Sequence, residues 1–569
     1  MINKNEKLIV YQLFPRIFTN SNSSCVHNGT IEQNGVGKMN EITDTVLHSI
    51  KELGVNCIWY TGIIEHATKT DYSSYGIKRD NPHIVKGNAG SPYAIKDYYD
   101  VSPDLAEDVN SRLSEFEALI ERTHNNGLKA IIDFVPNHTA REYFSDKKPK
   151  GVKDFGEDDD TNMFFSPNNN YYYITRQQFS PSIYLGSNQD SYIEFPAKAT
   201  GNDCFTAFCG EYDWYETVKL NYGKDYGDGS EHYTPIPDTW LKMLNILRYW
   251  ASKGVDGFRC DMVFMVPLAF WNWAIPAVKK DYPNIIFIGE IYDINLYRPF
   301  LSYGNFDYLY DKVNLYDTLV GIQKNNVSSA RLTNCWQTVE GISNRMLNFL
   351  ENHDEVRFGS VEYANDPSLV IPSLIVSSMI NCGPMMIYYG QELGEQAKDS
   401  EGFAGDNNRT TIFDYWSLDT VRRWYNNGKC DGAKLTQQEK WLRGVYSKIL
   451  KMCNDEKAIS VGSFFDLMYV NLQNQNFNPH RQFAFFRHYN EESLLIVVNF
   501  DKKKVNLEIN IPNAAFDMLN LPNGEGLCTE LISEVNKKLT ISREKPFNTV
   551  VDASSAVIWK ISNKNFKNT

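Results

Sequence analysis

Four short segments of this sequence place acidic, basic and imidazole side chains directly after a run of apolar residues. The segments are residues 133–138, 257–261, 287–290 and 349–354. The apolar runs predict buried strands, so the polar residues that follow should lie at one rim of a sheet. In a parallel barrel this rim is the catalytic face, because side chains from several strand ends meet there. Together the four segments predict an enzyme active site.

The carboxyl groups in these segments differ in their expected surroundings. Asp261 follows Arg259 by two positions on one predicted strand, so both side chains point to the same face. An arginine in that place keeps a carboxylate ionised, which suits a nucleophile. Glu290 follows a largely apolar run, and burial favours a protonated carboxyl group, which suits a general acid. Such a pair is what retaining glycoside hydrolysis requires.

Other polar residues arrive from two further strands: Asp133, His138, His353 and Asp354. A third carboxylate can hold sugar hydroxyl groups and favour distortion of the sugar ring. For any one residue of the constellation, a helix cap or a salt bridge at the barrel rim is an equally good explanation. For all of them together, catalysis is the better one.

The elements that must position these residues alternate between strands and helices from the start of the chain. Strands are predicted at residues 8–14, 55–60, 128–134, 255–259, 285–288, near 306–308, 345–350 and 385–389. Helical patterns lie between them, for example at residues 113–124 and 240–252. Eight strands in this rhythm predict a (β/α)8 TIM barrel.

Two stretches depart from that rhythm. Residues 139–235 are rich in Asn, Asp, Gly and Tyr and are too long for a barrel loop, so they are predicted to form an inserted subdomain after the third strand. Beyond about residue 455 short alternating strands predict a C-terminal all-β sandwich. The predicted division is residues 1–138 and 236–455 for the barrel, 139–235 for the subdomain and 456–569 for the sandwich.

Composition narrows the possible partners. A net charge of −13 over 569 residues argues against nucleic acid or an anionic membrane as the partner. The ten Cys show no metal-binding or disulfide spacing, which favours a reducing compartment. No 18-residue apolar stretch occurs, and the first residues lack a secretory apolar region. A cytoplasmic protein is expected, or a periplasmic or secreted one if a signal peptide was removed; the oligomeric state stays open.

With these motifs in place, the chain resembles glycoside hydrolase family 13, the α-amylase family, over nearly its full length. Further matches are residues 54–59 on the second predicted strand and residues 383–392 on the eighth. The resemblance implies that Asp261 is the nucleophile, Glu290 the acid/base and Asp354 the transition-state stabiliser. It implies sugar contacts by other residues: Tyr93 as a stacking platform, and Arg259, His138 and His353 at the cleavage subsite. The predicted substrate-binding set also includes Asp133 and Arg357.

Members of this family often hold a calcium ion between the barrel and the inserted subdomain. In this sequence Lys219 stands where an Asp would ligate the metal, near Asn137, and no His follows Asp261. An ammonium group can take the place of a cation but cannot ligate one, so no metal is expected there and no cofactor is required. A structural calcium elsewhere stays possible, for instance a weak one in the Asn-rich residues 20–34. The Lys-Leu-Asn pattern at residues 219–221 resembles the neopullulanase and cyclomaltodextrinase branch.

Three functions fit these features. The first is a retaining hydrolase of α-1,4 bonds in α-glucans or maltodextrins. The second is a transglycosylase or cyclomaltodextrinase of the same fold, in which only the attacking group or the substrate shape differs. The third is a non-catalytic glucan-binding protein, since fold alone does not establish activity. The presence of all three carboxylates favours catalysis over the third.

Overall fold

Eight parallel strands close into a barrel within the described part of the chain. The computed structural model describes residues 6–566, apart from the side chains of Asn188 and Ala404. Around the barrel run β1 (Ile9–Leu13), β2 (Cys57–Tyr60), β5 (Lys129–Phe134), β10 (Gly257–Cys260), β11 (Ile286–Gly289), β12 (Tyr308–Tyr310), β13 (Met346–Phe349) and β14 (Met385–Tyr388). The last strand pairs with β1 and closes the ring. The predicted TIM barrel is confirmed.

Helices cover the outside of the barrel. They are α3 (Asp44–Glu52), α4 (Arg112–Asn125), α5 (Asp238–Ser252), α6 (Leu268–Asp281), α7 (Ile294–Ser302), α8 (Asp317–Gln323) and α10 (Ile371–Met379). In α4, Phe116, Leu119 and Ile120 are buried, which is the spacing of one apolar helix face. Gly127 follows α4 with a positive φ of 69°, a conformation that glycine adopts without strain. The chain therefore turns directly from α4 into β5.

The strand register brings the polar strand ends to one level. Arg259 on β10 pairs with Asp133 on β5 and with Ile288 on β11. The preceding residues Ile131 and Ile132 are fully buried, as expected for strands covered on both faces. The side chains that the sequence places after each apolar run therefore meet at the same rim.

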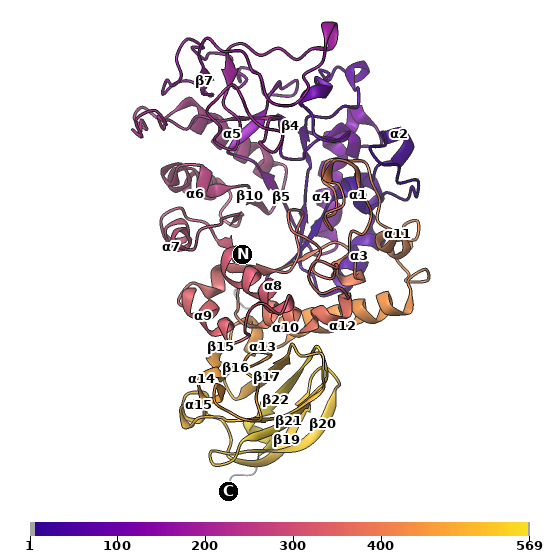
Figure 1. Cartoon of the computed structure of the whole chain (residues 1–569), viewed down its shortest axis with the longest axis vertical. Helices are drawn as coiled ribbons and strands as arrows, with labels where there is room; N and C mark the ends of the chain where they lie inside the picture. Colours follow the sequence, from indigo (N-terminus) through magenta and orange to yellow (C-terminus); the bar gives the residue numbers. More distant parts are fainter. Residues whose placement is uncertain (1–5, 567–569) are drawn as a thin grey trace.

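A subdomain is inserted between β5 and α5, and lies at the top of the molecule (Figure 1). Two short antiparallel pairs belong to it, β6 (His138–Ala140) with β9 (Thr217–Lys219), and β7 (Tyr173–Ile174) with β8 (Ala197–Lys198). A second excursion, the hairpin of β3 (Ile64–His66) and β4 (Ile95–Val101), leaves the barrel after β2. The inserted subdomain and the β3–β4 hairpin thus both border the rim of the barrel. The domain limits at residues 138, 235 and 455 stay predictions.

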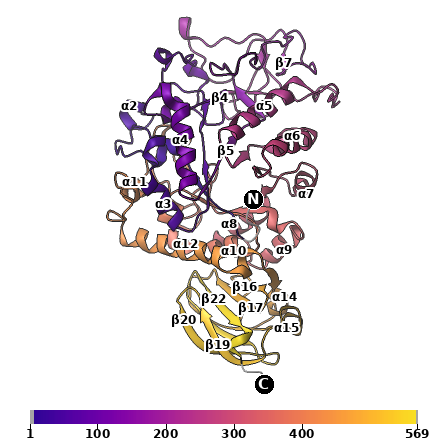
Figure 2. The ribbon, with the colours of Figure 1, turned by 180° about the vertical axis from the view of Figure 1, so that it is seen from behind.

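The C-terminal part is an all-β domain at the opposite end of the molecule, as both views show (Figures 1 and 2). Its larger sheet contains β15 (Ser463–Asp466), β16 (Gln482–Tyr489), β17 (Glu492–Asn499), β22 (Ser555–Ser562), β19 (Gly524–Glu530) and β20 (Val535–Ile541), in that order. A second sheet pairs β18 (Val505–Ile509) with β21 (Phe547–Val551). Trp559 donates from Nε1 to Thr549 at 3.1 Å and links the two layers.

Helix α12 (Gln437–Asp455) lies between the barrel and this C-terminal domain (Figure 1). Its side chains reach both, since Asn454 donates to the carbonyl of Gly54 at 2.8 Å and Lys448 to the carbonyl of Ile532 at 2.7 Å. A Thr436–Glu439 capping box fixes its first turn. None of the described helices is long and apolar enough to cross a membrane.

The β3–β4 hairpin contains a buried histidine, His66, that is neutral in the folded protein. His66 is buried, its Nδ1 lies 3.1 Å from the carbonyl of Ile64, and Nε2 faces Arg16. Burial, together with the charge of Arg16, lowers the pKa of His66 to about 3. The unfolded chain binds a proton near pH 6.5, so the stability that neutral His66 provides is complete above pH 6.5. It is lost as the pH falls towards 3.

Lowering the pH from 7 to 5 should therefore cost about 2 kcal/mol at His66 alone. In His66→Gln, where an amide oxygen can still accept from Arg16, we expect a correspondingly shallower loss of stability. Urea unfolding midpoints at the two pH values measure this, with His27→Gln as the control for an exposed histidine. Equal pH dependence in wild type and His66→Gln would contradict the prediction.

Candidate active site

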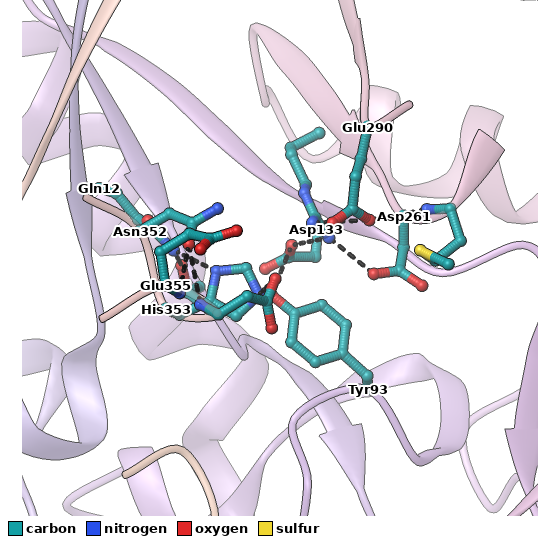
Figure 3. A network of polar contacts seen from close by, with 12 residues as sticks. Gln12, Tyr93, Asp133, Asp261, Glu290, Asn352, His353 and Glu355 are labelled. Atoms are coloured by element: carbon teal, nitrogen blue, oxygen red, sulfur yellow. Dashed lines mark hydrogen bonds and ion pairs between the residues drawn. The ribbon is translucent and has the colours of Figure 1, made fainter. Parts of the chain in front are cut away.

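A cleft of about 530 Å³ opens at the carboxyl ends of the barrel strands, beside the inserted subdomain. Six of the residues predicted from sequence line it: Tyr93, His138, Asp261, Glu290, His353 and Asp354. Other lining residues include Lys86, Trp214, Tyr292, Lys312, Glu355 and Phe413. The structure therefore brings together side chains from the segments that follow β5, β10, β11 and β13, which lie far apart in the sequence (Figure 3).

The guanidinium of Arg259 lies beneath the cleft and bridges its carboxylates. One terminal nitrogen is 2.8 Å from Asp261 Oδ1 and the other is 2.9 Å from Glu290 Oε2. Asp133 Oδ1 lies 3.5 Å from the same nitrogen that contacts Asp261. The sequence predicted that Arg259 serves Asp261, whereas the tertiary structure divides its charge among three carboxyl groups. The reason is the register, which sets Asp133 and Ile288 level with Arg259 on the two neighbouring strands.

This sharing changes the electrostatics of Asp261. Burial and the charge of Glu290 raise the pKa of Asp261 well above its usual range, and Arg259 opposes them without cancelling them. Arg259 therefore does not act on Asp261 alone, and its charge competes with burial and with the charge of Glu290. Asp261 and Glu290 thus lie on one guanidinium, and their mutual repulsion acts within a buried site.

Both oxygens of Glu290 accept hydrogen bonds. The N–H of Met262 donates to Oε2 at 2.8 Å, and the hydroxyl of Tyr292 donates to Oε1 at 2.5 Å. Met262 adopts a left-handed backbone conformation with φ at 43°, which is strained for a residue with a side chain. That turn, directly after Asp261, aims the N–H of Met262 at Glu290. The local strain thus fixes the direction in which the Glu290 carboxyl group faces.

Asp354 stands across the cleft and belongs to a separate hydrogen-bonded chain. His353 Nε2 is 3.0 Å from Asp354 Oδ2, and His353 Nδ1 is 2.9 Å from the side-chain nitrogen of Gln12 at the end of β1. Burial raises the pKa of Asp354, but His353 and Arg259 outweigh it and lower that pKa to about 2. Asp354 is therefore ionised at neutral pH.

A flat aromatic surface forms one wall of the cleft. The ring of Tyr93 stacks on His353 with centroids 5.0 Å apart, and Figure 3 shows the two rings side by side. Asp133 is held behind them by the indole of Trp59 at 3.1 Å and the N–H of Gly62 at 3.2 Å. Both donors bond Asp133 Oδ2, which leaves Oδ1 to face Arg259 and, at 3.4 Å, the hydroxyl of Tyr93.

His138 lines the subdomain side of the cleft as a neutral base. Burial, with the nearby ammonium of Lys219, lowers the pKa of His138 to about 3. Its ring lies 5.3 Å from that of Trp214, and Nδ1 is 3.1 Å from the side-chain nitrogen of Asn137. A neutral imidazole in this place can exchange hydrogen bonds with a hydroxyl group.

Arg357 is not brought to the cleft. It is fully buried, with one terminal nitrogen 2.9 Å from Glu351 Oε2 and also 2.9 Å from the carbonyl of Tyr389, and it bonds Thr410 as well. These contacts use its donors to fasten the segment after β13 to the end of β14. Arg357, predicted from sequence to bind substrate, therefore lies behind the cleft and stabilises the loop after β13.

Several residues that line the cleft were missed from sequence, among them Trp214, Tyr292, Lys312 and Glu355, and so was Gln12, which contacts His353. Two carried a usable signal. Tyr292 follows Glu290 by two positions, the same spacing that linked Arg259 to Asp261. Gln12 is a polar residue in the otherwise apolar first strand. Trp214 and Glu355 sit on loops whose path the sequence pattern does not define, and Lys312 begins the short helix η8 (Lys312–Tyr316).

The place where a calcium ion would join barrel and subdomain is taken by the ammonium of Lys219. This group is 2.5 Å from Asn137 Oδ1, 2.6 Å from Asp203 Oδ1 and 3.1 Å from the carbonyl of Met265. The oxygen atoms that would ligate a metal are thus already bonded to a cation of the chain itself. These residues do not fit a divalent ion.

The barrel, the cleft at its carboxyl rim and the convergent carboxylates define the class of protein, a glycoside hydrolase. The family model described as alpha amylase, catalytic domain, matches residues 12–463, and the chain belongs to that family. Members of this family act on α-glucans.

Individual relatives are distant. Alpha-amylase 2 of Dictyoglomus thermophilum is 22% identical over 515 residues, covering 89% of this chain and 71% of the relative. The cyclomaltodextrinase of Thermoanaerobacter pseudethanolicus is 21% identical, covering 90% and 73%. Among solved structures, the maltogenic alpha-amylase AmyB of Thermotoga neapolitana has a TM-score of 0.63 at 18% identity, covering 99% of this chain and all of that one. The Geobacillus thermoleovorans alpha-amylase, solved with acarbose, has a TM-score of 0.62 at 18% identity, with 99% of each chain covered.

Proposed function

We propose that this protein hydrolyses α-1,4-glucosidic bonds of maltodextrins with retention of the anomeric configuration. The observation that carries the proposal is the bridging of Asp261 and Glu290 by one guanidinium at the floor of the cleft, with ionised Asp354 opposite. Two neighbouring carboxyl groups, one ionised and one protonated, are the nucleophile and the acid that such a reaction requires.

In the first step Asp261 attacks the anomeric carbon and forms a glycosyl ester. The bond from that carbon to the leaving oxygen breaks, and the proton of Glu290 goes to that oxygen. Glu290 suits the acid role because Met262 and Tyr292 fix its direction. Arg259 suits the role of a positive group that stabilises Asp261 before attack and Glu290 after it has lost its proton.

In the second step a water molecule attacks the ester carbon. Ionised Glu290 takes the proton of the water, the bond to Asp261 breaks, and two inversions give net retention. Ionised Asp354 stabilises the positive charge that develops on the sugar in both transition states. Tyr93 stacks under the sugar ring, while His138 and His353 bond its hydroxyl groups.

A cyclomaltodextrinase-like or transglycosylating activity is the second candidate. It is favoured by the match to a cyclomaltodextrinase over 536 residues and by Lys219 in the place of a metal ligand. In transglycosylation a sugar hydroxyl replaces water as the attacking group, and the residues at the floor of the cleft are the same.

Product analysis on maltoheptaose, β-cyclodextrin and pullulan tests these proposals. We expect shorter maltodextrins from maltoheptaose, first released as the α-anomer when followed by NMR. Release of the β-anomer would overturn the retaining mechanism. Products longer than the substrate would favour transglycosylation, and faster opening of β-cyclodextrin than cleavage of maltoheptaose would favour the cyclomaltodextrinase.

Lys219→Met should loosen the attachment of the subdomain. The exchange leaves Asn137 and Asp203 without their cationic partner, and because the Asp203 side chain is 34% exposed, we expect a cost of about 1–3 kcal/mol. We expect a lower unfolding midpoint and faster proteolysis within residues 139–235. Lys153→Met, which removes an exposed pair with Asp158, is the control and should change neither. Unchanged stability of Lys219→Met would show that the ammonium is dispensable there.

A further inference from the structure

Four carboxyl groups meet where the β3–β4 hairpin contacts the start of the inserted subdomain. They belong to Glu65 on β3, Asp97 and Asp100 on β4, and Asp146 after β6, and one oxygen of each lies within 4.8 Å of the others. None of the four lines the cleft. The cluster is therefore separate from the proposed hydrolytic site.

The positive charges that the described residues bring to this cluster are too few to neutralise it. Arg112 contacts Asp100 and lies 3.7 Å from Asp146, and Lys147 is 3.9 Å from Asp146. The charge of Lys96 also acts on Glu65, but its ammonium is shared with Asp80 at 3.0 Å. Glu65, Asp97 and Asp100 are nevertheless almost fully buried. Buried carboxylates require a compensating charge or a proton.

One carboxyl oxygen in the cluster also lacks a hydrogen-bond partner. Glu65 is 1% exposed, and its Oε2 accepts no hydrogen bond from the described residues. Asp97, in contrast, is held firmly by the hydroxyl of Ser145 at 2.6 Å and the N–H of Asp146 at 3.0 Å. A buried acceptor beside positioned carboxylates is the arrangement of a site that lacks its ligand.

We propose that Glu65, Asp97, Asp100 and Asp146 together bind one Ca²⁺ ion. The donor set is purely carboxylate oxygen, which suits a hard cation. Ca²⁺ binds oxygen at about 2.3–2.6 Å, so ligands on opposite sides of the ion stand up to about 5 Å apart. Mutual separations within 4.8 Å therefore place all four oxygens around a single ion of this size.

The position of this ion gives it a structural role. It joins the subdomain segment of Ser145 and Asp146 to β4, the strand that follows Tyr93. From the same strand, Tyr98 donates to the carbonyls of Val135 and His138 at 2.5 and 2.9 Å. The cation holds the subdomain against the β3–β4 hairpin at a point that Lys219 does not reach.

The cluster is short of positive charge in the structure. Burial and the neighbouring carboxylates raise the pKa of Glu65 well above its usual range, and burial raises that of Asp97 to about 6. A bound cation supplies the positive charge that these carboxyl groups lack.

Calorimetric titration of the chelator-treated full chain with CaCl₂ tests the proposal. We expect one ion per chain and at least a tenfold loss of affinity in Glu65→Gln and in Asp146→Asn. Asp203→Asn, which removes a carboxylate beside Lys219, is the matched control and should bind as wild type does. The unfolding midpoint of wild type should rise by about 2 °C or more with saturating Ca²⁺, and that of Asp146→Asn by less.

Asp146 is the most accessible member of the cluster, so its substitution should disturb the fold least. Calcium binding to Asp146→Asn therefore tests the proposal if Glu65→Gln fails to fold. No binding to wild type at about 5 mM Ca²⁺, beyond the weakest usual range of protein calcium sites, would overturn the proposal. Undiminished binding in Asp146→Asn would place the ion elsewhere, for instance at residues 20–34, and would overturn it equally. Neither result would affect the hydrolytic proposal, because product analysis depends on other residues.

Discussion

Asp261→Asn should lower kcat on maltoheptaose by about 10⁴-fold or more while the fold is retained. An amide cannot form the glycosyl ester, so the proposed two-step path is closed. The exchange also removes one of two carboxyl groups that repel each other beneath the cleft. We therefore expect an unfolding midpoint within a few degrees of wild type, which separates loss of chemistry from loss of structure. Stopped assays with the purified variant measure the first effect and thermal unfolding the second.

Asp256→Asn is the matched control for that experiment. Asp256 immediately precedes β10, the strand that Asp261 immediately follows, and contacts His124 and the N–H of Ala130 at the other rim. Its exchange should leave activity within about twofold of wild type, as for a partly exposed surface pair. If Asp261→Asn retained a tenth of wild-type activity, another residue would have to be the nucleophile.

Glu290→Gln should lower the turnover of a substrate with a poor leaving group far more than the first step of a substrate with an acidic leaving group. Maltoheptaose releases a sugar alkoxide that needs a proton, so its turnover should fall by about 10³-fold or more. An activated aryl maltoside releases a stable phenolate without help, so its first step should survive and give a burst of phenolate. The second step lacks its base and becomes limiting. Pre-steady-state absorbance of the phenolate measures both phases.

Addition of azide to Glu290→Gln tests the acid/base role of Glu290 more directly. A small anion can attack the glycosyl ester without base assistance, so it should restore turnover of the aryl substrate and yield an α-configured glycosyl azide. A β-configured product would mean direct displacement without an ester. Equal loss of activity on both substrate types would remove Glu290 from the acid role.

Much of the positioning of the site follows from the linear pattern. Apolar runs ending in polar residues predicted the barrel strands and the rim, because strands buried on both faces have few other sequence signatures. The spacing of Arg259 and Asp261 placed both side chains on one face, and the structure has them 2.8 Å apart. Lys219 was singled out by the family resemblance, which implies a metal-ligating Asp at that position, and by its ammonium group, which cannot ligate a metal.

Other features depend on neighbours that are remote in sequence. Arg259 serves Asp133 and Glu290 as well as Asp261 because strand register, not spacing along one strand, sets its partners. Arg357 follows the same rim segment as His353 but turns away to Glu351 and Tyr389, because the loop after β13 folds back beneath the surface. The carboxylate cluster joins Glu65 to Asp146 across 81 residues of sequence, through a hairpin and a subdomain whose contact no periodicity encodes.

The sequence by itself determined the barrel, the rim and the residue types available for chemistry. These depend on local hydrophobic pattern and on side-chain identity, which are properties of short segments. Only the tertiary structure decided how the charges are shared, which predicted residues reach the cleft, and where four carboxylates converge. Those outcomes depend on electrostatic interactions that act over a few ångströms through space. Strand register and loop packing set the distances between the charged groups, which lie on segments far apart along the chain.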